Sequence, residues 1–271
     1  MKAHLLEAGR GEPVVILHGG DGEAVDWAPL MGALQDSVKT YAVDRPGFGL
    51  TERFDYQHVD LRSHAADFVT SVLDALDIHA ATLVGGSMGG FFALATALAY
   101  PNRVHGLILI GMPAGLTRSG PLLMRIMCGV PGAARLFMKR FASMEGLSRQ
   151  YRAMFHTDPD TLPQLYFRTR LAGMTLPGAL DTWAVLLRRC AGLRGIRPEV
   201  YLGDELPKLQ PPTLLIWGEH DMAPASVGHE ASTRIPHGRF ICLRGVGHLP
   251  FLQVPDECAR LILEFIRRPV T

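Results

Sequence analysis

The stretch LVGGSMGG at residues 83–90 decides the fold of this chain. The apolar run 81–84 that leads into it is typical of a buried strand, and 91–99, rich in Ala and Leu, favours a helix. The chain must therefore turn from strand to helix within about two residues around Ser87. Glycines on both sides give the room that so sharp a turn needs. We expect the Ser87 hydroxyl to stand clear of the backbone at a helix N-terminus, where negative charge is favoured.

Outward from this turn, strand and helix patterns alternate. Strands are predicted at 1–8, 14–17, 38–43, 81–84, 104–110, 213–217 and 239–243. Helices are predicted at 27–34, 65–76, 91–99, 226–234 and 256–267. Strands that alternate with helices indicate an α/β fold, in which a parallel sheet is covered on both faces.

The alternation stops between residues 113 and 207. This part has no clear strand pattern, only helical pieces such as 121–128 and 133–142 with Gly and Pro between them. We therefore predict a core domain of residues 1–112 and 208–271, with residues 113–207 inserted into it as a helical cap.

Composition narrows the class of protein. The chain has 271 residues, 48% of them hydrophobic, and a net charge of +1, which argues against a nucleic-acid partner and against disorder. The four cysteines have no short spacing, so we expect free thiols in a reducing compartment and no zinc site. No secretory signal pattern and no apolar run of membrane-spanning length is present, which favours a cytoplasmic protein without a membrane span.

A serine nucleophile needs a base, and the base needs an orienting acid. Asp221 ends the segment WGEHD and His248 lies in GVGHLP, each just after a predicted strand. Both should lie at the carboxyl edge of the sheet, where open α/β sheets gather their sites. Alone, Asp221 could cap the next helix and His248 could be a solvated turn residue. Glu219 and Asp204 are the competing acids.

An oxyanion needs two backbone N–H groups. The predicted donors are Met88, which follows the serine, and Gly20, in the loop after strand 14–17. His18 is expected to brace this loop rather than to react. The alternative for His18-Gly19-Gly20 is a simple tight turn.

These motifs resemble those of the α/β-hydrolase fold, over nearly the whole chain. The similar segments are 18–20, DRPGFG at 44–49, 85–90, 217–221 and 247–248. The esterase, perhydrolase and C–C hydrolase branches come nearest. The resemblance implies an α/β-hydrolase fold with Ser87, Asp221 and His248 as the catalytic triad, in the chain order of that family. The usual N-terminal hairpin is shortened, so we expect the first edge strand to be missing and the mostly parallel sheet to have about seven strands.

The expected function is hydrolysis of a small or medium ester, thioester or lactone through an acyl-enzyme, with no cofactor and no metal. One alternative is a C–C hydrolase acting on vinylogous diketone acids. Enzymes of that branch usually have asparagines near the site and a Trp after the catalytic His, whereas this chain has Leu249 and a single asparagine. A second alternative is a ligand receptor without turnover. A small-molecule substrate is expected, and either a monomer or a homodimer.

The inserted segment supplies candidates for the substrate pocket. Met124, Met127 and Phe137, with neighbours such as Leu122, Leu123, Ile126 and Leu136, could line a pocket over Ser87, together with Leu249, or could simply bury the cap against the core. Residues 114–207 carry 13 Lys and Arg against 7 Asp and Glu, a net charge of +6, while the remainder carries −5. Arg168 and Arg170, then Arg188 and Arg189, are candidates to grip a carboxylate, although such a charge excess is usually a solvated face.

Overall fold

A seven-stranded sheet forms the centre of the molecule. The computed structural model describes residues 1–20, 22–118, 120 and 122–268. The strand order is β1-β3-β2-β4-β5-β8-β9, with β1 antiparallel to β3 at one edge and the other strands parallel. The strands are β1 (Leu5–Gly9), β2 (Pro13–Leu17), β3 (Lys39–Val43), β4 (Ala81–Gly86), β5 (Val104–Ile110), β8 (Thr213–Gly218) and β9 (Gly238–Leu243). The prediction of a mostly parallel sheet of about seven strands is confirmed.

The central strands are buried on both faces. In β2, Val15 and Leu17 pack on one side of the sheet, whereas Val14 and Ile16 pack on the other. All four are fully buried. Such strands read as unbroken apolar runs, which is why they could be recognised in the sequence.

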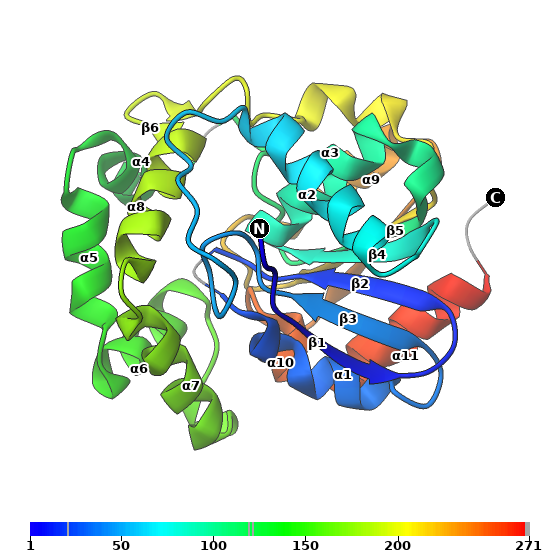
Figure 1. Ribbon diagram of the computed structural model, residues 1–271, viewed down its shortest axis with the longest axis horizontal. Helices are drawn as coiled ribbons and strands as arrows, with labels where there is room; N and C mark the ends of the chain where they lie inside the picture. Colours follow the sequence, from blue (N-terminus) through cyan, green and yellow to red (C-terminus); the bar gives the residue numbers. More distant parts are fainter. Residues whose placement is uncertain (21, 119, 121, 269–271) are drawn as a thin grey trace.

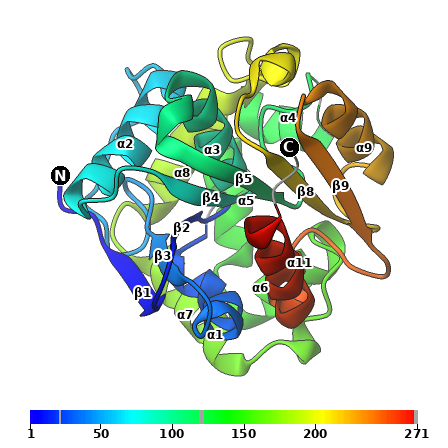
Figure 2. The same cartoon turned by 90° about the vertical axis from the view of Figure 1, so that its right-hand side faces the viewer.

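Helices cover both faces of the sheet (Figures 1 and 2). One face carries α2 (Leu61–Ala75), α3 (Met88–Ala99) and α9 (Ala225–Arg234), and the other carries α1 (Ala28–Leu34), α10 (Pro250–Gln253) and α11 (Pro255–Arg267). Short 3₁₀ turns are η1 (Ala24–Trp27), η2 (Pro101–Arg103), η3 (Pro159–Thr161) and η4 (Gly203–Lys208). Helix α2 begins four residues before its predicted start, because the Asp60 side chain caps it by accepting from the Ser63 N–H at 2.7 Å.

The connection from β5 to β8 is largely helical, and its helices lie together beside the sheet (Figure 1). They are α4 (Leu122–Gly129), α5 (Ala133–Phe141), α6 (Met144–Met154), α7 (Gln164–Thr175) and α8 (Ala179–Cys190). We refer to residues 113–207 as the helical segment. Helices α4 and α5 match the predicted pieces, although Pro121, placed in the first of them, lies outside the described residues.

The expectation that the helical segment contains no strand was wrong at one point. Two-residue strands β6 (Ala191–Gly192) and β7 (Gly195–Ile196) pair as a small antiparallel hairpin. Two residues are too few to produce a recognisable alternation, so this hairpin left no periodic signal in the sequence. Among the described residues, no helix combines the length and the apolar character needed to cross a membrane.

Candidate active site

Ser87 occupies a strained turn between β4 and α3. Its backbone angles are φ +49° and ψ −111°, a conformation that costs about 1–3 kcal/mol for a residue with a side chain. The flanking glycines make the turn possible. A Cβ on Gly89 would lie 2.0 Å from the Leu17 carbonyl oxygen, and one on Gly85 would lie 2.5 Å from the Gly89 oxygen. The predicted strand-to-helix turn is therefore confirmed as geometry, and a side chain at either glycine would break it.

Helix α3 begins directly after Ser87, at Met88. The first N–H groups of a helix lack partners within the helix, so Met88 offers a donor beside the Ser87 side chain. The Ser87 carbonyl oxygen accepts from the Ala114 N–H at 2.9 Å, which ties the turn to the segment that follows β5.

Asp221 and His248 form a buried pair. The distance from His248 Nδ1 to Asp221 Oδ1 is 2.6 Å, and their side chains are 3% and 0% exposed. Asp221 also accepts from the backbone N–H groups of Met112 at 2.9 Å and Met222 at 2.6 Å. Because a carboxylate only accepts, Nδ1 of His248 donates the proton, and Nε2 is left as the basic nitrogen of the neutral ring.

The pair lies at the same edge of the sheet as Ser87. Ser87, Asp221 and His248 follow the parallel strands β4, β8 and β9, and Gly111 follows β5, which lies between β4 and β8. A Cβ on Gly111 would lie 2.6 Å from the His248 carbonyl oxygen and 3.4 Å from Asp221 Oδ2. The strand β5, which Gly111 follows, thus lies between the strand that leads to Ser87 and the strands that lead to Asp221 and His248.

The two competing acids serve other contacts. Glu219 is exposed, and its Oε2 accepts from the Gly245 N–H at 2.8 Å, which fixes the loop after β9. Asp204 is exposed and forms ion pairs with Arg118 and Arg234. Of the three acids considered, the structure brings only Asp221 to His248.

The helical segment contacts the loop that carries His248. The His248 N–H donates to the Phe155 carbonyl oxygen at 2.9 Å, and the Phe155 ring stacks on the imidazole with 5.7 Å between centroids and 29° between planes. A Cβ on Gly247 would lie 2.1 Å from the same Phe155 oxygen. The residues that follow α6 therefore help to hold His248 in place.

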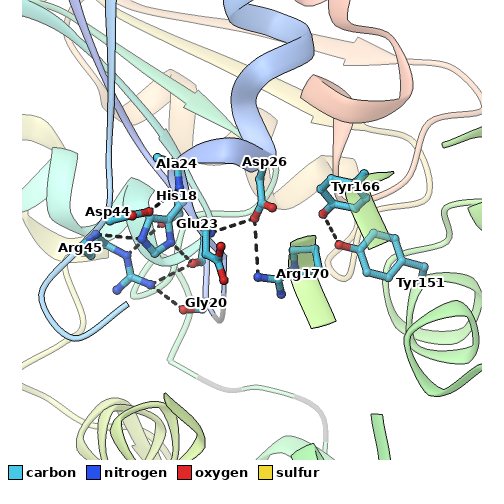
Figure 3. A network of polar contacts seen from close by, with 11 residues as sticks. His18, Gly20, Glu23, Ala24, Asp26, Asp44, Arg45, Tyr151, Tyr166 and Arg170 are labelled. Atoms are coloured by element: carbon cyan, nitrogen blue, oxygen red, sulfur yellow. Dashed lines mark hydrogen bonds and ion pairs between the residues drawn. The ribbon is translucent and has the colours of Figure 1, made fainter. Parts of the chain in front are cut away.

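The loop after β2 is held by Arg45 (Figure 3). This buried guanidinium donates from Nε to the His18 oxygen at 3.1 Å, and from Nη2 to the oxygens of Gly19 at 2.9 Å and Gly20 at 2.5 Å. The Arg45 N–H donates to His18 Nε2 at 2.9 Å, and His18 Nδ1 lies 2.8 Å from the Gly19 oxygen. His18 therefore braces this loop, as predicted.

This arrangement directs the Gly20 N–H. In a trans peptide the C=O and the following N–H point in opposite directions. Since the Gly19 oxygen faces Arg45, the Gly20 N–H faces away from it. A Cβ on Gly19 would lie 3.3 Å from the Ser87 Cβ, so the loop flanks the candidate nucleophile. The Trp183 ring of α8 covers the other side, 2.7 Å from where a Cβ of Gly20 would stand.

Burial lowers the pKa of His18 well below its usual value, and the charge of Arg45 lowers it further. His18 therefore stays neutral in the folded protein, whereas it gains a proton below about pH 6.5 when the chain unfolds. The unfolded state then binds more protons, so folding stability is complete above that pH and falls as the pH drops below it.

His18→Gln should remove this part of the pH dependence, because the amide does not titrate. We expect the wild-type free energy of unfolding to fall by about 1 kcal/mol more than that of the variant between pH 7.5 and pH 5.5. Denaturant unfolding at both pH values measures the difference. His79→Gln, at an exposed histidine, is the matched control and should keep the wild-type pH dependence. Parallel curves for wild type and His18→Gln would contradict this account.

The cysteines are poor competitors of Ser87 as a nucleophile. Cys128, Cys190, Cys242 and Cys258 are free thiols, and burial raises the pKa of Cys128 to about 11 and those of Cys190 and Cys258 to about 12. Thiols with such pKa values are almost entirely protonated at neutral pH. Within the described ranges, no group of His, Cys, Asp and Glu has the arrangement of a metal site.

The proposed pocket residues are scattered rather than gathered. Met127 is buried among Cys128, Ala134, Leu187 and Ala191 inside the helical segment. Met124 and Phe137 are half-buried against that cluster, and Leu249 packs on the α1–α11 side of the core. Arg168 is exposed on α7 and joins none of these groups. Their substrate contacts therefore stay a prediction.

Several neighbours named with them face outward instead. Leu122, Leu123, Ile126 and Leu136 are exposed, so the expectation that they line a pocket over Ser87 was wrong. Three of them lie on α4, where the single charged residue, Arg125, does not define a polar face, so periodicity cannot say which side of the helix is buried. Leu136 lies on α5, between Arg135 and the buried Met138.

The arginine that does turn inward is Arg170. It is 2% exposed, and its Nη1 lies 3.8 Å from Oδ2 of the buried Asp26 in η1 (Figure 3). Nearby, the hydroxyls of Tyr151 and Tyr166 contact each other, and burial raises the pKa of Tyr166 well above its usual value. Of the other candidates, Arg188 is exposed, and Arg189 donates to the Val59 oxygen at 3.0 Å.

The sequence interpretation missed three residues at the site: Arg45, Phe155 and Trp183. Each acts on a partner far away in the chain, and only Arg45 left a signal. It is a charged residue directly after the buried strand β3, in a segment that resembles a family motif.

Comparisons with known proteins found relatives along nearly the whole chain. A family model described as "Alpha/beta hydrolase family" matches residues 14–261. A 2-hydroxy-6-oxononadienedioate/2-hydroxy-6-oxononatrienedioate hydrolase of Burkholderia vietnamiensis is 30% identical, over 99% of this chain and 92% of that protein. A pimeloyl-[acyl-carrier protein] methyl ester esterase of Xanthomonas campestris is also 30% identical, over 97% of this chain and 98% of that protein.

Solved structures share the fold. A serine hydrolase of Cycloclasticus zankles has a TM-score of 0.81 at 21% identity, covering 98% of this chain and 94% of that one. A thermophilic esterase of Thermogutta terrifontis has a TM-score of 0.75 at 22% identity, covering 99% and 94%. At these identities the likeness concerns the arrangement of strands and helices.

Proposed function

Because the chain belongs to the alpha/beta hydrolase family, we propose that it is a serine hydrolase that cleaves small to medium ester, thioester or lactone bonds through an acyl-enzyme. The observation that carries this proposal is the buried His248–Asp221 pair, 2.6 Å apart, at the sheet edge where the strained Ser87 turn lies. Such a turn, base and acid, in this chain order, are the parts that acyl transfer requires.

In this mechanism Ser87 Oγ attacks the substrate carbonyl carbon while His248 Nε2 takes the hydroxyl proton. As the bond from the acyl carbon to the leaving group breaks, His248 gives that proton to the departing alkoxide or thiolate, which leaves as an alcohol or thiol. In the second half, His248 activates a water that attacks the acyl carbon, and the proton returns to Ser87. Asp221 keeps the proton on Nδ1 of the neutral ring and stabilises the imidazolium that forms in each half.

The developing oxyanion would be held by the N–H groups of Met88 and Gly20. Met88 contributes from the start of α3, and Gly20 from the loop whose carbonyls are bound by Arg45. Arg45 is thus proposed to position the second donor before substrate arrives. Preorganised donors cost no rearrangement during the reaction, which is the source of their effect.

We propose that the helical segment is the cap of this site and that the acyl group is neutral. The cap contributes Phe155 against His248 and Trp183 against Gly20. Of the cap arginines considered as ligands for a substrate carboxylate, Arg170 is the one that is buried. Its charge is already compensated by Asp26. A neutral acyl group that lies against the Trp183 ring therefore suits this site better than an acyl group that carries a carboxylate. The reducing cytoplasm remains the proposed location, in keeping with four free cysteines.

A C–C bond hydrolase is the second candidate, favoured by the relative from Burkholderia vietnamiensis. Initial rates on p-nitrophenyl esters of rising chain length, and on a vinylogous 1,5-diketone acid, separate the two. We expect ester hydrolysis, with kcat/KM for a neutral ester at least equal to that for its ω-carboxylate analogue at high salt. Faster turnover of the diketone acid than of every ester would establish the second candidate instead.

A further inference from the structure

The outer face of α4 is apolar although it faces solvent. Leu122, Ile126 and Val130 follow one another at four-residue spacing, and Leu123 lies beside them on the same side of the helix. These four residues are 41% to 67% exposed. Apolar side chains of a helix normally pack in an interior, so this is a face that the described part of the chain leaves exposed.

The hairpin β6–β7 extends this face. A Cβ on Gly129 would lie 2.6 Å from Leu193 Cγ, so Leu193, which is 55% exposed, lies against the end of α4. Arg125 Nε donates to the Leu193 carbonyl oxygen at 2.7 Å, which fixes the hairpin to the helix. We call Leu122, Leu123, Ile126, Val130 and Leu193 the apolar strip.

Arginines lie beside the apolar strip and on the neighbouring part of the helical segment. Arg194 follows Leu193 at the hairpin tip, Arg125 lies at the edge of α4, and Arg197 Nε donates to the Arg188 carbonyl oxygen close by. Throughout the described ranges, none of these four arginines lies within ion-pair distance of an acid. The net charge of +6 on residues 114–207 thus includes a local group without counter-charges.

We propose that the apolar strip docks this protein on the anionic face of a phospholipid bilayer. An exposed apolar band with basic neighbours is the pattern of a segment that lies in a membrane interface. The aliphatic side chains would enter the boundary between headgroups and acyl chains, while the arginines would contact lipid phosphates. The protein would lie on the bilayer without crossing it.

The chemistry of the strip favours a bilayer over a protein partner. Protein interfaces are rich in aromatic side chains and form a hydrogen bond about every 100–200 Å². The strip consists of four leucine or isoleucine side chains and one valine, with no aromatic ring and no hydroxyl or amide group. A hydrocarbon boundary accepts such side chains without any partner, and the exposed arginines beside the strip suit an anionic surface.

Vesicle co-sedimentation tests the proposal without any need for turnover. Wild-type protein should sediment with vesicles of equal parts phosphatidylcholine and phosphatidylglycerol and stay in solution with phosphatidylcholine alone. High salt should weaken the binding. The double variant Leu123→Gln with Ile126→Gln, and separately Arg125→Gln with Arg194→Gln, should each lower the partition coefficient by about ten-fold or more.

Matched controls carry the same changes at the other end of the helical segment, where Figure 1 places α6 and α7. Met144→Gln with Leu165→Gln removes two exposed apolar side chains, and Arg140→Gln with Arg149→Gln removes the same charge. Both controls should bind as the wild type does. The variants that change only exposed side chains should keep the wild-type melting temperature. Arg125→Gln with Arg194→Gln should melt slightly lower, because it loses the hydrogen bond from the half-buried Arg125 to the Leu193 carbonyl oxygen.

Absence of wild-type binding to the anionic vesicles would overturn the proposal. Equal losses in the strip variants and in their controls would also overturn it, because general charge attraction would then explain the binding. If vesicles are not bound but the strip variants change the elution volume of the free protein, the strip is covered by a second copy of the chain. If only an acidic protein domain is bound, the strip is a protein-docking surface.

Discussion

Replacing Ser87 by alanine should lower kcat for ester hydrolysis by about 10⁴- to 10⁶-fold. This change removes the oxygen that we propose as the nucleophile, while the Asp221–His248 pair and the proposed oxyanion donors remain. The fold should persist, because Ala is no larger than Ser and the flanking glycines still permit the turn. Steady-state kinetics on a p-nitrophenyl ester, with a thermal melt of the same preparation, measure both effects.

Ser226→Ala is the matched control, since it removes an exposed serine hydroxyl on α9, and it should keep full activity. More than a few per cent of wild-type activity in purified Ser87→Ala would mean that Ser87 is not the nucleophile. The possible contamination by a host esterase is checked by purifying both variants in parallel.

Asp221→Asn should have the second largest effect, about 10³- to 10⁴-fold in kcat with little change in KM. The size follows the same replacement in other Ser-His-Asp enzymes. An amide can donate to Nδ1 of His248, so the ring proton moves to Nε2 and the nitrogen that we propose takes the serine proton is no longer basic. KM should hold, because Asp221 contacts His248 and backbone N–H groups rather than substrate.

Glu219→Gln is the matched control for this prediction. It makes the same carboxylate-to-amide change two residues away, at a side chain that binds the Gly245 N–H. We expect at most a few-fold loss. A damaging Glu219→Gln combined with a mild Asp221→Asn would show that the acid is assigned wrongly.

The parts of this molecule that could be predicted from sequence are those specified by near neighbours. The Ser87 turn depends on Gly85 and Gly89, because a Cβ on Gly85 would meet the backbone of the same turn and a Cβ on Gly89 would meet the backbone of β2. The strands β2, β4, β5 and β8 are buried on both faces and so appear as apolar runs. Asp221 follows β8, and His248 follows the less buried edge strand β9, each by a few residues, so their shared edge of the sheet could be inferred.

The parts that could not be predicted depend on contacts between distant residues. Phe155 contacts the His248 loop from the helical segment, far away in the chain. Arg45 donates to the carbonyl oxygens of residues 18–20, and no local sequence pattern predicts that contact. Helix α4 gave the opposite difficulty: its apolar residues were recognised, but the direction in which they face is set by packing against α5, α8 and β6. A helix with no polar face gives no signal of which side is outward.

Intact-protein and peptide mass spectrometry after rapid quenching with an activated ester tests the central claim most directly. We expect a burst of product, provided that deacylation is slow, and an acyl adduct on the peptide that contains Ser87. Hydroxylamine should remove the adduct, and His248→Ala should abolish its formation. An adduct on Cys242 or another thiol, with Ser87 unmodified during turnover, would contradict the proposal that Ser87 is the nucleophile.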